Sequence, residues 1–196
     1  MRLSQEFKIS NKRYIDEDEL NKISTIYLEE LPSDILPNLG INAIKEYFEL
    51  MLKNNSDIII IKKNQDIVGF IVLRFKKVRL RKLLNLKSIF KFFFNNIFNP
   101  SLFLRLFFQV FIKVKIPDFC SEIHAFAVKK EFTSRGAGKI LINESEKVSK
   151  EKKFRGIFTK THNERLYQYY LKDKKVNLIK KYNILKRNYY NIYWDL

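Results

Sequence analysis

Cysteine is almost absent from this chain, which has only Cys120 in 196 residues. A single thiol cannot form an internal disulfide, so a reducing compartment is expected, and a small buried side chain is favoured over a nucleophile at this position. Histidine is nearly as scarce. His124 and His162 lie far apart in sequence, and no Cys/His cluster has the spacing of metal ligands. We therefore expect no metal site.

Acidic residues are few beside basic ones, with 21 Asp and Glu against 38 Lys and Arg and a formal net charge of +17. This excess favours anionic partners such as nucleotides, CoA, nucleic acid or anionic lipid, although a Lys-, Asn- and Ile-rich composition can also arise without any binding role. The 46% hydrophobic content excludes a disordered chain, and the length suits one domain over residues 1–196. The N-terminus lacks a signal-peptide pattern, so the expected location is the cytoplasm.

Glycine is also sparse, yet two of the five glycines, Gly136 and Gly138, lie one residue apart. The strand candidate Glu122 to Val128 precedes them, and a helix is predicted after them. Such a turn leaves unpaired N–H groups and the positive end of the helix dipole at one point, which favours a phosphate, and Arg135 and Lys139 add cationic side chains. The third glycine of the dinucleotide fingerprint and the Gly-Lys-Ser/Thr ending of the P-loop are both missing.

This stretch resembles the pyrophosphate loop of the GNAT superfamily of acyl-CoA-dependent N-acyltransferases, Gln/Arg-x-x-Gly-x-Gly/Ala. Thr133 stands where that family usually has Gln or Arg. The segment Asn163 to Tyr170 resembles the family's Asn-x-x-Ala-x-x-Leu-Tyr helix. The resemblance covers residues 15–75 and 120–195. It implies an α/β fold with a mixed central sheet flanked by helices, a helical insertion between strands, and acetyl-CoA as co-substrate.

The resemblance also implies the residues of the site. Glu122 would be the general base, its pKa raised by partial burial, and Tyr170 would donate a proton to the CoA sulfur. His124 competes for the role of base because histidine titrates near neutral pH, and a water is a third route. The residues expected to bind the cofactor are Thr133, Ser134, Arg135, Gly136, Ala137, Gly138 and Lys139 in the loop, Phe126, Ala127 and Val128 in the strand, and Asn163.

The strand before the loop is expected to act through its backbone as well. Groups of Phe126 to Val128 would pair with the pantetheine arm like an added strand, which requires the sheet to splay beyond this strand, and one of their N–H groups would bind the oxyanion. Asn163 would bind the pantetheine arm or hold its own loop. Because alternate residues of a strand share a face, Glu122, His124, Phe126 and Val128 are expected to point the same way.

Periodicity and turn signals predict an order of elements typical of a mixed α/β sandwich. Gly69 lies inside one predicted strand and indicates a bulge or a close approach by another segment. The predicted strands are 3–9, 57–62, 66–75, 121–128, 156–161, 176–181 and 188–194, with a hairpin at 63–65. The predicted helices are 16–31, 36–53, 138–151 and 164–172.

Residues 76–115 stand apart, with ten Lys or Arg, nine phenylalanines and no Asp or Glu. Pro100 divides them into two helical halves, neither of which has the roughly 18 uninterrupted apolar residues of a membrane span. They could pack beside the sheet with their basic face over an anionic substrate, lie on an anionic membrane surface, or bind nucleic acid. A subset of GNAT-like sugar N-acetyltransferases has a basic helical insert at this place.

The function implied is acetyl transfer from acetyl-CoA to the primary amine of a small anionic acceptor, such as an amino sugar or a nucleotide-linked amino sugar. The alternative is a non-catalytic binding protein whose cationic insert contacts membrane or nucleic acid. The expected location remains the cytoplasm, with peripheral contact at the inner membrane surface through residues 76–115 as the other possibility.

Overall fold

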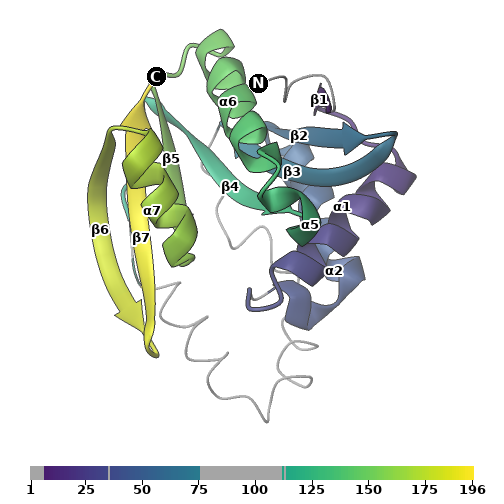
Figure 1. Ribbon diagram of the computed structural model, residues 1–196, viewed down its shortest axis with the longest axis horizontal. Helices are drawn as coiled ribbons and strands as arrows, with labels where there is room; N and C mark the ends of the chain where they lie inside the picture. The colour runs from purple at the N-terminus through teal and green to yellow at the C-terminus, as the bar shows by residue number, and fades with distance from the viewer. Residues whose placement is uncertain (1–6, 35, 76–111, 113) are drawn as a thin grey trace.

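The computed structural model describes residues 7–34, 36–75, 112 and 114–196, and its strands and helices form layers around one sheet (Figure 1). The elements run in the order β1 (Lys8–Lys12), α1 (Glu17–Glu30), the 3-10 helix η1 (Leu36–Leu39), α2 (Ile41–Lys53), β2 (Ser56–Lys63), β3 (Asp66–Arg74), β4 (Cys120–Val128), α5 (Lys130–Thr133), α6 (Ala137–Glu151), β5 (Gly156–Thr161), α7 (Glu164–Asp173), β6 (Val176–Ile184) and β7 (Arg187–Asp195).

The sheet has seven strands in the order β1-β2-β3-β4-β5-β7-β6. Neighbouring strands are antiparallel except for β4 and β5, which run parallel. The chain returns from β4 to β5 through α5 and α6, as a parallel pair requires a crossover connection. The mixed sheet flanked by helices confirms the predicted fold class.

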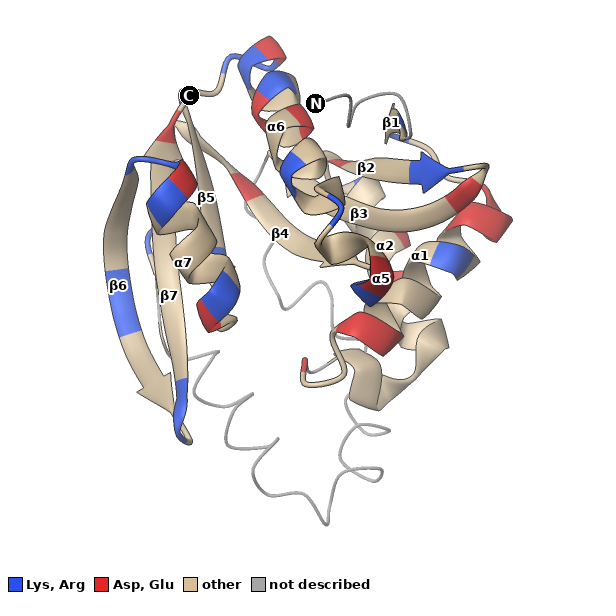
Figure 2. Cartoon of the chain, viewed as in Figure 1, with Lys and Arg blue, Asp and Glu red and all other residues tan. Residues whose placement is uncertain are grey.

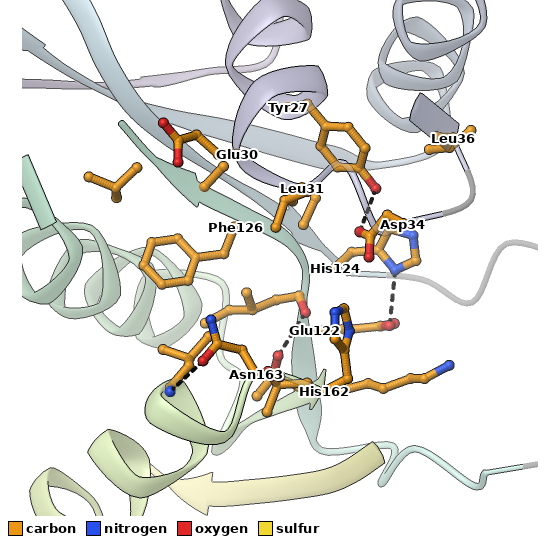
Figure 3. Close-up of a pocket in the computed structure, with 18 of the residues that line it drawn as sticks. Tyr27, Glu30, Leu31, Asp34, Leu36, Glu122, His124, Phe126, His162 and Asn163 are labelled. Carbon is orange, nitrogen blue, oxygen red and sulfur yellow. Dashed lines mark hydrogen bonds and ion pairs between the residues drawn. The ribbon is translucent and has the colours of Figure 1, made fainter. Parts of the chain in front are cut away.

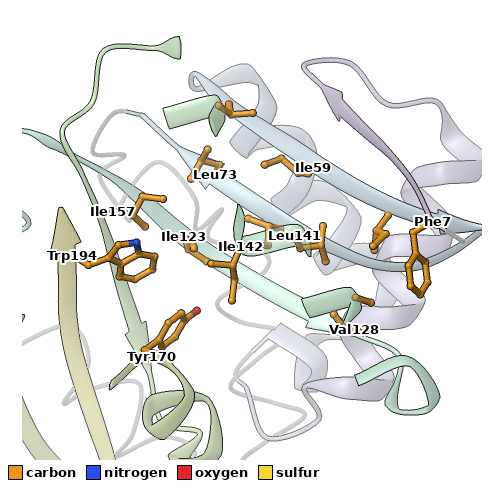
Figure 4. Packing of buried hydrophobic residues seen from close by; sticks show 14 of the residues in the cluster. Phe7, Ile59, Leu73, Ile123, Val128, Leu141, Ile142, Ile157, Tyr170 and Trp194 are labelled. Atoms are coloured by element: carbon orange, nitrogen blue, oxygen red, sulfur yellow. The ribbon is translucent and has the colours of Figure 1, made fainter. Parts of the chain in front are cut away.

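Helices cover both faces of the sheet because its central strands bury both sides. In β2, Ile59 and Ile61 pack into the core formed with α6, while Ile58 and Ile60 pack into the core formed with α1 and α2. All four side chains are fully buried, and each burial stabilises the fold by about 1.5–3 kcal/mol. Leu141 and Ile142 of α6 lie in the first of these cores (Figure 4).

Most predicted elements are present within a residue or two of their expected ends. The first strand lies later than expected, at β1, and residues 3–6 of the prediction lie outside the described part of the chain. The single helix predicted over 36–53 is wrong. Gly40 has φ +86, a left-handed conformation that no helix interior allows, so the segment divides into η1 and α2.

Gly69 explains how tightly β3 and β4 pack. A side-chain carbon at this position would lie 2.9 Å from the carbonyl oxygen of Ala127 and 3.0 Å from Cγ2 of Val128. The register between β2 and β3 also shifts opposite this glycine, between Ile61 and Lys62. The expectation of a bulge or a close approach at Gly69 is confirmed, since the close approach is at Gly69 and the register shift lies beside it.

The basic insert predicted over 76–115 lies outside the described residues except for 112, 114 and 115. Its helical content and its three proposed roles therefore stay predictions. Among the helices that the structure describes, none is long and apolar enough to cross a membrane.

Candidate active site

The sheet splits between its two parallel strands. Pairing of β4 with β5 runs from Cys120 opposite Gly156 to Ile123 opposite Thr159 and ends there, and the strands then diverge (Figure 1). The last link is a hydrogen bond of 3.1 Å from the Thr159 hydroxyl to the Ile123 carbonyl. The expected splay beyond β4 is thus confirmed, and the β5-facing edge of residues 124–128 has no strand partner among the described residues.

A cleft of about 1520 Å³ occupies this split. Side chains from several elements point into it (Figure 3). Tyr27 and Asp34 enter from the side of α1, Glu122 and His124 from β4, and Asn163 from the start of α7. Of the predicted cofactor-binding residues, those that line the cleft are Phe126, Ala127, Val128, Thr133, Ser134, Gly136, Gly138, Lys139 and Asn163.

The N-terminus of α6 opens onto the cleft through its glycine turn. Gly136 is the N-cap residue with φ +82, no side chain caps the helix, and its first turn has no acidic residue. The first four N–H groups of an α-helix have no partner within it, and the dipole makes this end positive. A side-chain carbon on Gly136 would meet nothing within 4 Å, so the space above the turn is open. The turn can therefore accept a phosphate group at its backbone.

The side chains around this turn offer fewer free charges to an anion than the sequence predicts. The Lys139 ammonium lies 3.0 Å from Oδ1 of Asp173 on α7, so its charge is already balanced within the protein. The Arg135 guanidinium stacks over the ring of Phe132, 5.5 Å from its centroid, and Arg135 does not line the cleft. The Ala137 side chain is fully buried, which leaves only its backbone to contact a ligand. The groups at this turn that remain available to an anion are therefore mainly backbone N–H groups.

A β-bulge at His124 changes the direction of the β4 side chains. Leu73 of β3 lies opposite Ile123 and Val72 opposite Ala125, so His124 is an extra residue in β4. As a result Ile123 faces the core with α6, while Ala125 faces the core with α1 and α2. The expectation that Glu122, His124, Phe126 and Val128 share one face is therefore wrong, because a bulge reverses the alternation along a strand. Phe126 and Val128 pack on the α6 side.

Glu122 lies at the centre of a polar chain that joins β3, β4 and α2. The guanidinium of Arg74, its cross-strand neighbour, donates to Oε2 of Glu122. Oε1 lies 3.1 Å from Nδ1 of His124, and Nε2 of His124 bonds to the hydroxyl of Tyr47. The Glu122 and Arg74 side chains are each 11% exposed and that of His124 is 26% exposed, so the imidazole is the most open member of the three.

The electrostatics of Glu122 differ from those predicted. Burial raises the pKa of its carboxyl, but its interactions with the His124 imidazole and the Arg74 guanidinium lower it by more, and the net pKa lies below the ordinary value. The expected raised pKa is therefore wrong. An ionised carboxylate with both oxygens occupied is a weak acceptor for a further proton.

Tyr170 lies at the buried wall of the cleft, and its hydroxyl has no hydrogen-bond partner in the described part of the chain. The side chain is fully buried. Burial raises the pKa of this phenol, so it stays protonated at neutral pH. A buried hydroxyl without a partner is costly, and a ligand in the cleft would relieve that cost.

Asn163 holds the start of α7. Its Oδ1 accepts a hydrogen bond of 3.1 Å from the backbone N–H of Leu166, which makes Asn163 the N-cap. Of its two expected roles, holding the loop is confirmed. Binding of the pantetheine arm by its remaining amide group stays a prediction.

The sequence did not point to several residues of the cleft. Arg74 lies in a predicted strand, one residue before its end, and Tyr47 belongs to the apolar stripe of a predicted helix, so neither residue was predicted to have a role in the site. Across the cleft, Tyr27 donates to Oδ2 of Asp34 over 3.0 Å. Lys160 lies over the rings of Tyr182 and Tyr189, 6.0 and 5.1 Å from their centroids. Only tertiary contacts bring these residues together. In the part of the chain described, no group of three or more His, Cys, Asp or Glu side chains could hold a metal ion.

Comparisons with known proteins agree with this geometry. The sequence model of the acetyltransferase (GNAT) family matches residues 20–172. Among solved structures, a protein from Pyrococcus horikoshii OT3 is 17% identical with TM-score 0.64, covering 97% of this chain and 99% of that one. The PaiA N-acetyltransferase from Thermoplasma acidophilum, in complex with coenzyme A, is 14% identical with TM-score 0.58, covering 96% and 99%.

A Bacillus subtilis acetyltransferase in complex with CoA is 16% identical with TM-score 0.53, covering 97% of this chain and 99% of that one. No curated protein sequence matches the chain. The sheet, its split and the family match together define an acetyl-CoA-dependent N-acetyltransferase. The chain belongs to the acetyltransferase (GNAT) family.

Proposed function

We propose that this enzyme transfers an acetyl group from acetyl-CoA to the primary amine of a small acceptor that binds in the described cleft. The observation that carries the proposal is the uncapped N-terminus of α6 at the place where β4 and β5 part, with the unpartnered hydroxyl of Tyr170 behind it. Two structures with this fold, from Thermoplasma acidophilum and Bacillus subtilis, were solved with CoA, which supports the choice of donor.

The diphosphate of the donor would bind at the glycine turn. The backbone N–H groups of residues 136–139 supply hydrogen bonds, and the helix dipole favours the negative charge. The side chains of Thr133 and Ser134 flank this position in the cleft. The pantetheine arm would extend along the free edge of β4 at Phe126, Ala127 and Val128, where it can pair like an added strand.

The reaction moves two protons. The amine nitrogen forms a bond to the thioester carbonyl carbon and the carbon–sulfur bond breaks, which gives an amide and the CoA thiolate. Tyr170 donates its hydroxyl proton to that sulfur, because burial keeps the phenol protonated and its hydroxyl has no other partner among the described residues, and the tyrosinate regains a proton from solvent before the next turnover. The proton of the amine leaves toward the polar chain that contains Glu122, whose ionised carboxylate attracts the proton without being its direct acceptor. The protein therefore acts as acid on one side of the thioester and as base on the other.

An amino sugar, free or linked to a nucleotide, is the acceptor class we propose. Lys160, Tyr182 and Tyr189 line the cleft and offer an ammonium group for a phosphate and aromatic faces for a sugar or base ring. Asp34 on the opposite side can bind a cationic amine. Charge also differs between the two flanks of the molecule, because α1 carries five acidic residues and one lysine whereas the charged residues of β6 are two lysines (Figure 2). Of these residues, Glu30 lines the cleft. The basic residues 76–115 support an anionic acceptor by their composition.

The test is a turnover screen that measures CoA thiol release from acetyl-CoA with amino sugars, nucleotide-linked amino sugars, polyamines and peptides. We expect turnover with an amino sugar and a rise in melting temperature with CoA, because a ligand that binds only the folded state stabilises it. Thermal stabilisation by CoA with turnover on polyamines alone would keep the transferase and reject the acceptor class. No CoA effect and no turnover would reject both.

A further inference from the structure

We propose that Tyr47 and His124 form a proton relay, the path by which the acceptor amine loses its proton. Glu122 and Arg74 are positioning residues that hold His124 in the tautomer whose Nε2 can accept a proton. The inference rests on the proposed acetyl transfer and names the atoms that serve it. It assigns a role to Tyr47, which the apolar pattern of its helix did not suggest.

The four side chains come from three elements and meet at the cleft. Tyr47 projects from α2, His124 and Glu122 from β4, and Arg74 from the end of β3, and all four line the cleft. The ring centroids of Tyr47 and His124 lie 5.8 Å apart, with 32° between the ring planes. The bulge moves His124 out of the regular alternation of β4. Its side chain can therefore contact both Glu122 and Tyr47, which lies on the helix that packs on the sheet.

The chemistry of the partners fixes the direction of this chain. An ionised carboxylate can only accept hydrogen bonds, so Nδ1 of His124 must carry the proton that points to Oε1 of Glu122. Arg74 occupies Oε2 and keeps the carboxylate ionised. In a neutral imidazole the other nitrogen is then an acceptor, so Nε2 of His124 receives the hydroxyl proton of Tyr47. Each donor therefore points away from the cleft and toward Glu122.

This arrangement leaves the oxygen of Tyr47 with free lone pairs for a proton from the cleft. As the amine nitrogen bonds to the thioester carbon, its proton passes to the Tyr47 oxygen while the Tyr47 proton passes to Nε2 of His124. Burial raises the pKa of the Tyr47 phenol, which favours this coupled transfer over an isolated tyrosinate. The step ends with a neutral Tyr47 and an imidazolium next to the carboxylate of Glu122, and no proton is gained or lost.

Other charged groups also face this chain. In addition to burial, Asp34, in the segment between α1 and η1, raises the pKa of Tyr47, Tyr47 raises that of Tyr27 on α1, and Glu122 raises that of Lys160 on β5 against the larger effect of burial, which lowers it. Among these charged groups Glu122 is hydrogen-bonded to the imidazole, and its carboxylate therefore decides where the proton rests.

The first experiment measures the tautomer of His124 without any substrate. The chain has only two histidines, so ¹⁵N-labelled imidazole signals of the wild type and of His124→Gln assign both residues by difference. We expect the Nδ1-protonated tautomer at neutral pH, and a change of that tautomer population in Glu122→Gln. An Nε2-protonated His124 in the wild type would overturn the relay, because Tyr47 would then have to accept rather than donate.

The second experiment measures kcat for thiol release against pH. We expect Tyr47→Phe and His124→Gln each to lower kcat at least tenfold, and His124→Gln to change the dependence of kcat on pH, because it removes the group that receives the proton. Tyr193→Phe is the matched control, since Tyr193 packs on Phe119 outside the cleft and should keep wild-type kcat. Circular dichroism of each variant shows whether it is folded.

The possible outcomes distinguish a failure of the proton relay from a failure of the proposed acetyl transfer. Wild-type kcat and pH profile in both Tyr47→Phe and His124→Gln would overturn the relay while acetyl transfer stands. A wild-type enzyme without turnover on any amine would reject the proposed function and the relay with it, whatever tautomer His124 shows.

Discussion

The ring of Tyr170 stacks on the indole of Trp194, with 5.1 Å between ring centroids and 30° between ring planes. This packing holds the phenol in the core without using its hydroxyl, which has no hydrogen bond among the described residues. The indole N–H is bound elsewhere, to Oε1 of Glu146 over 2.8 Å. The hydroxyl of Tyr170 can therefore be removed without changing the stacking that positions its ring.

Tyr170→Phe should lower kcat about a hundredfold, within the usual contribution of a general acid. The melting temperature should stay equal or rise, because the removed hydroxyl is buried without a partner and such a group costs about 1–3 kcal/mol. Thiol release and a thermal melt measure the two effects. Tyr167→Phe is the control, since Tyr167 stacks on Tyr190 at 3.8 Å and does not line the cleft. Wild-type turnover in Tyr170→Phe would remove the acid role.

Gly136→Leu should abolish measurable binding of CoA in a titration calorimeter. The side chain would fill the open space above the α6 N-terminus, and its left-handed backbone would cost roughly 1–2 kcal/mol of folding stability. Gly40→Leu is a close control, because Gly40 is also an N-cap residue, has φ +86 and has nothing within 4 Å. Both variants should lose stability, because each places a leucine at a positive φ. Equal CoA affinity in the two would reject the glycine turn as the diphosphate site.

The turn was predictable because its signals are local. A strand pattern, two glycines and an amphipathic helix follow one another within 30 residues, and Asn163 fixes the register that leads to Tyr170. The bulge at His124 was not predictable, since it exists only as a mismatch in length between β4 and β3. The same holds for the pair of Arg74 with Glu122, which are 48 residues apart. The polar chain of the cleft depends on both features, so the sequence indicated candidates for the base without showing how they are connected.

Glu19→Gln should make the free energy of unfolding less dependent on pH in the acidic range. Glu19 is buried between Lys12 of β1 at 2.5 Å and Lys62 of β2 at 2.7 Å. Burial raises the pKa of its carboxyl, but the hydrogen bonds and charges of the two lysines lower it by more, so the folded-state pKa is below the ordinary value. The carboxylate therefore stabilises the fold above about pH 4.3, the pKa expected in the unfolded chain, and that stabilisation is lost as the pH falls through the folded-state pKa.

Urea unfolding at a series of pH values measures this effect. At pH 7 we expect Glu19→Gln to be less stable than the wild type by about 1–3 kcal/mol, the usual contribution of hydrogen bonds to charged groups. The difference should shrink below about pH 4. Glu17→Gln, in the same helical turn but exposed, should change stability by a few tenths of a kcal/mol at most. A difference for Glu19→Gln that stays constant down to pH 3 would contradict the ionic origin.

Gly69→Ala should weaken CoA binding from a position outside the cleft. The new methyl group would lie 2.9 Å from the carbonyl oxygen of Ala127, so the β4 backbone must move along the edge where the pantetheine arm is proposed to pair. Gly156→Ala is the matched control. Its methyl group would lie 2.8 Å from Sγ of Cys120 and 3.0 Å from the carbonyl oxygen of Trp194, at the closed end of the split.

Both alanine variants should lose about 1–3 kcal/mol of stability, the usual cost of forcing an extra carbon into a packed core. Only Gly69→Ala should also lower CoA affinity, by at least tenfold, because only there does the displaced backbone belong to the open edge of β4. Calorimetric titration with CoA at a temperature where both variants are folded separates the two effects. Equal affinities in the two variants would mean that the donor does not use the backbone of residues 126–128, and the pairing of its pantetheine arm with β4 would have to be abandoned.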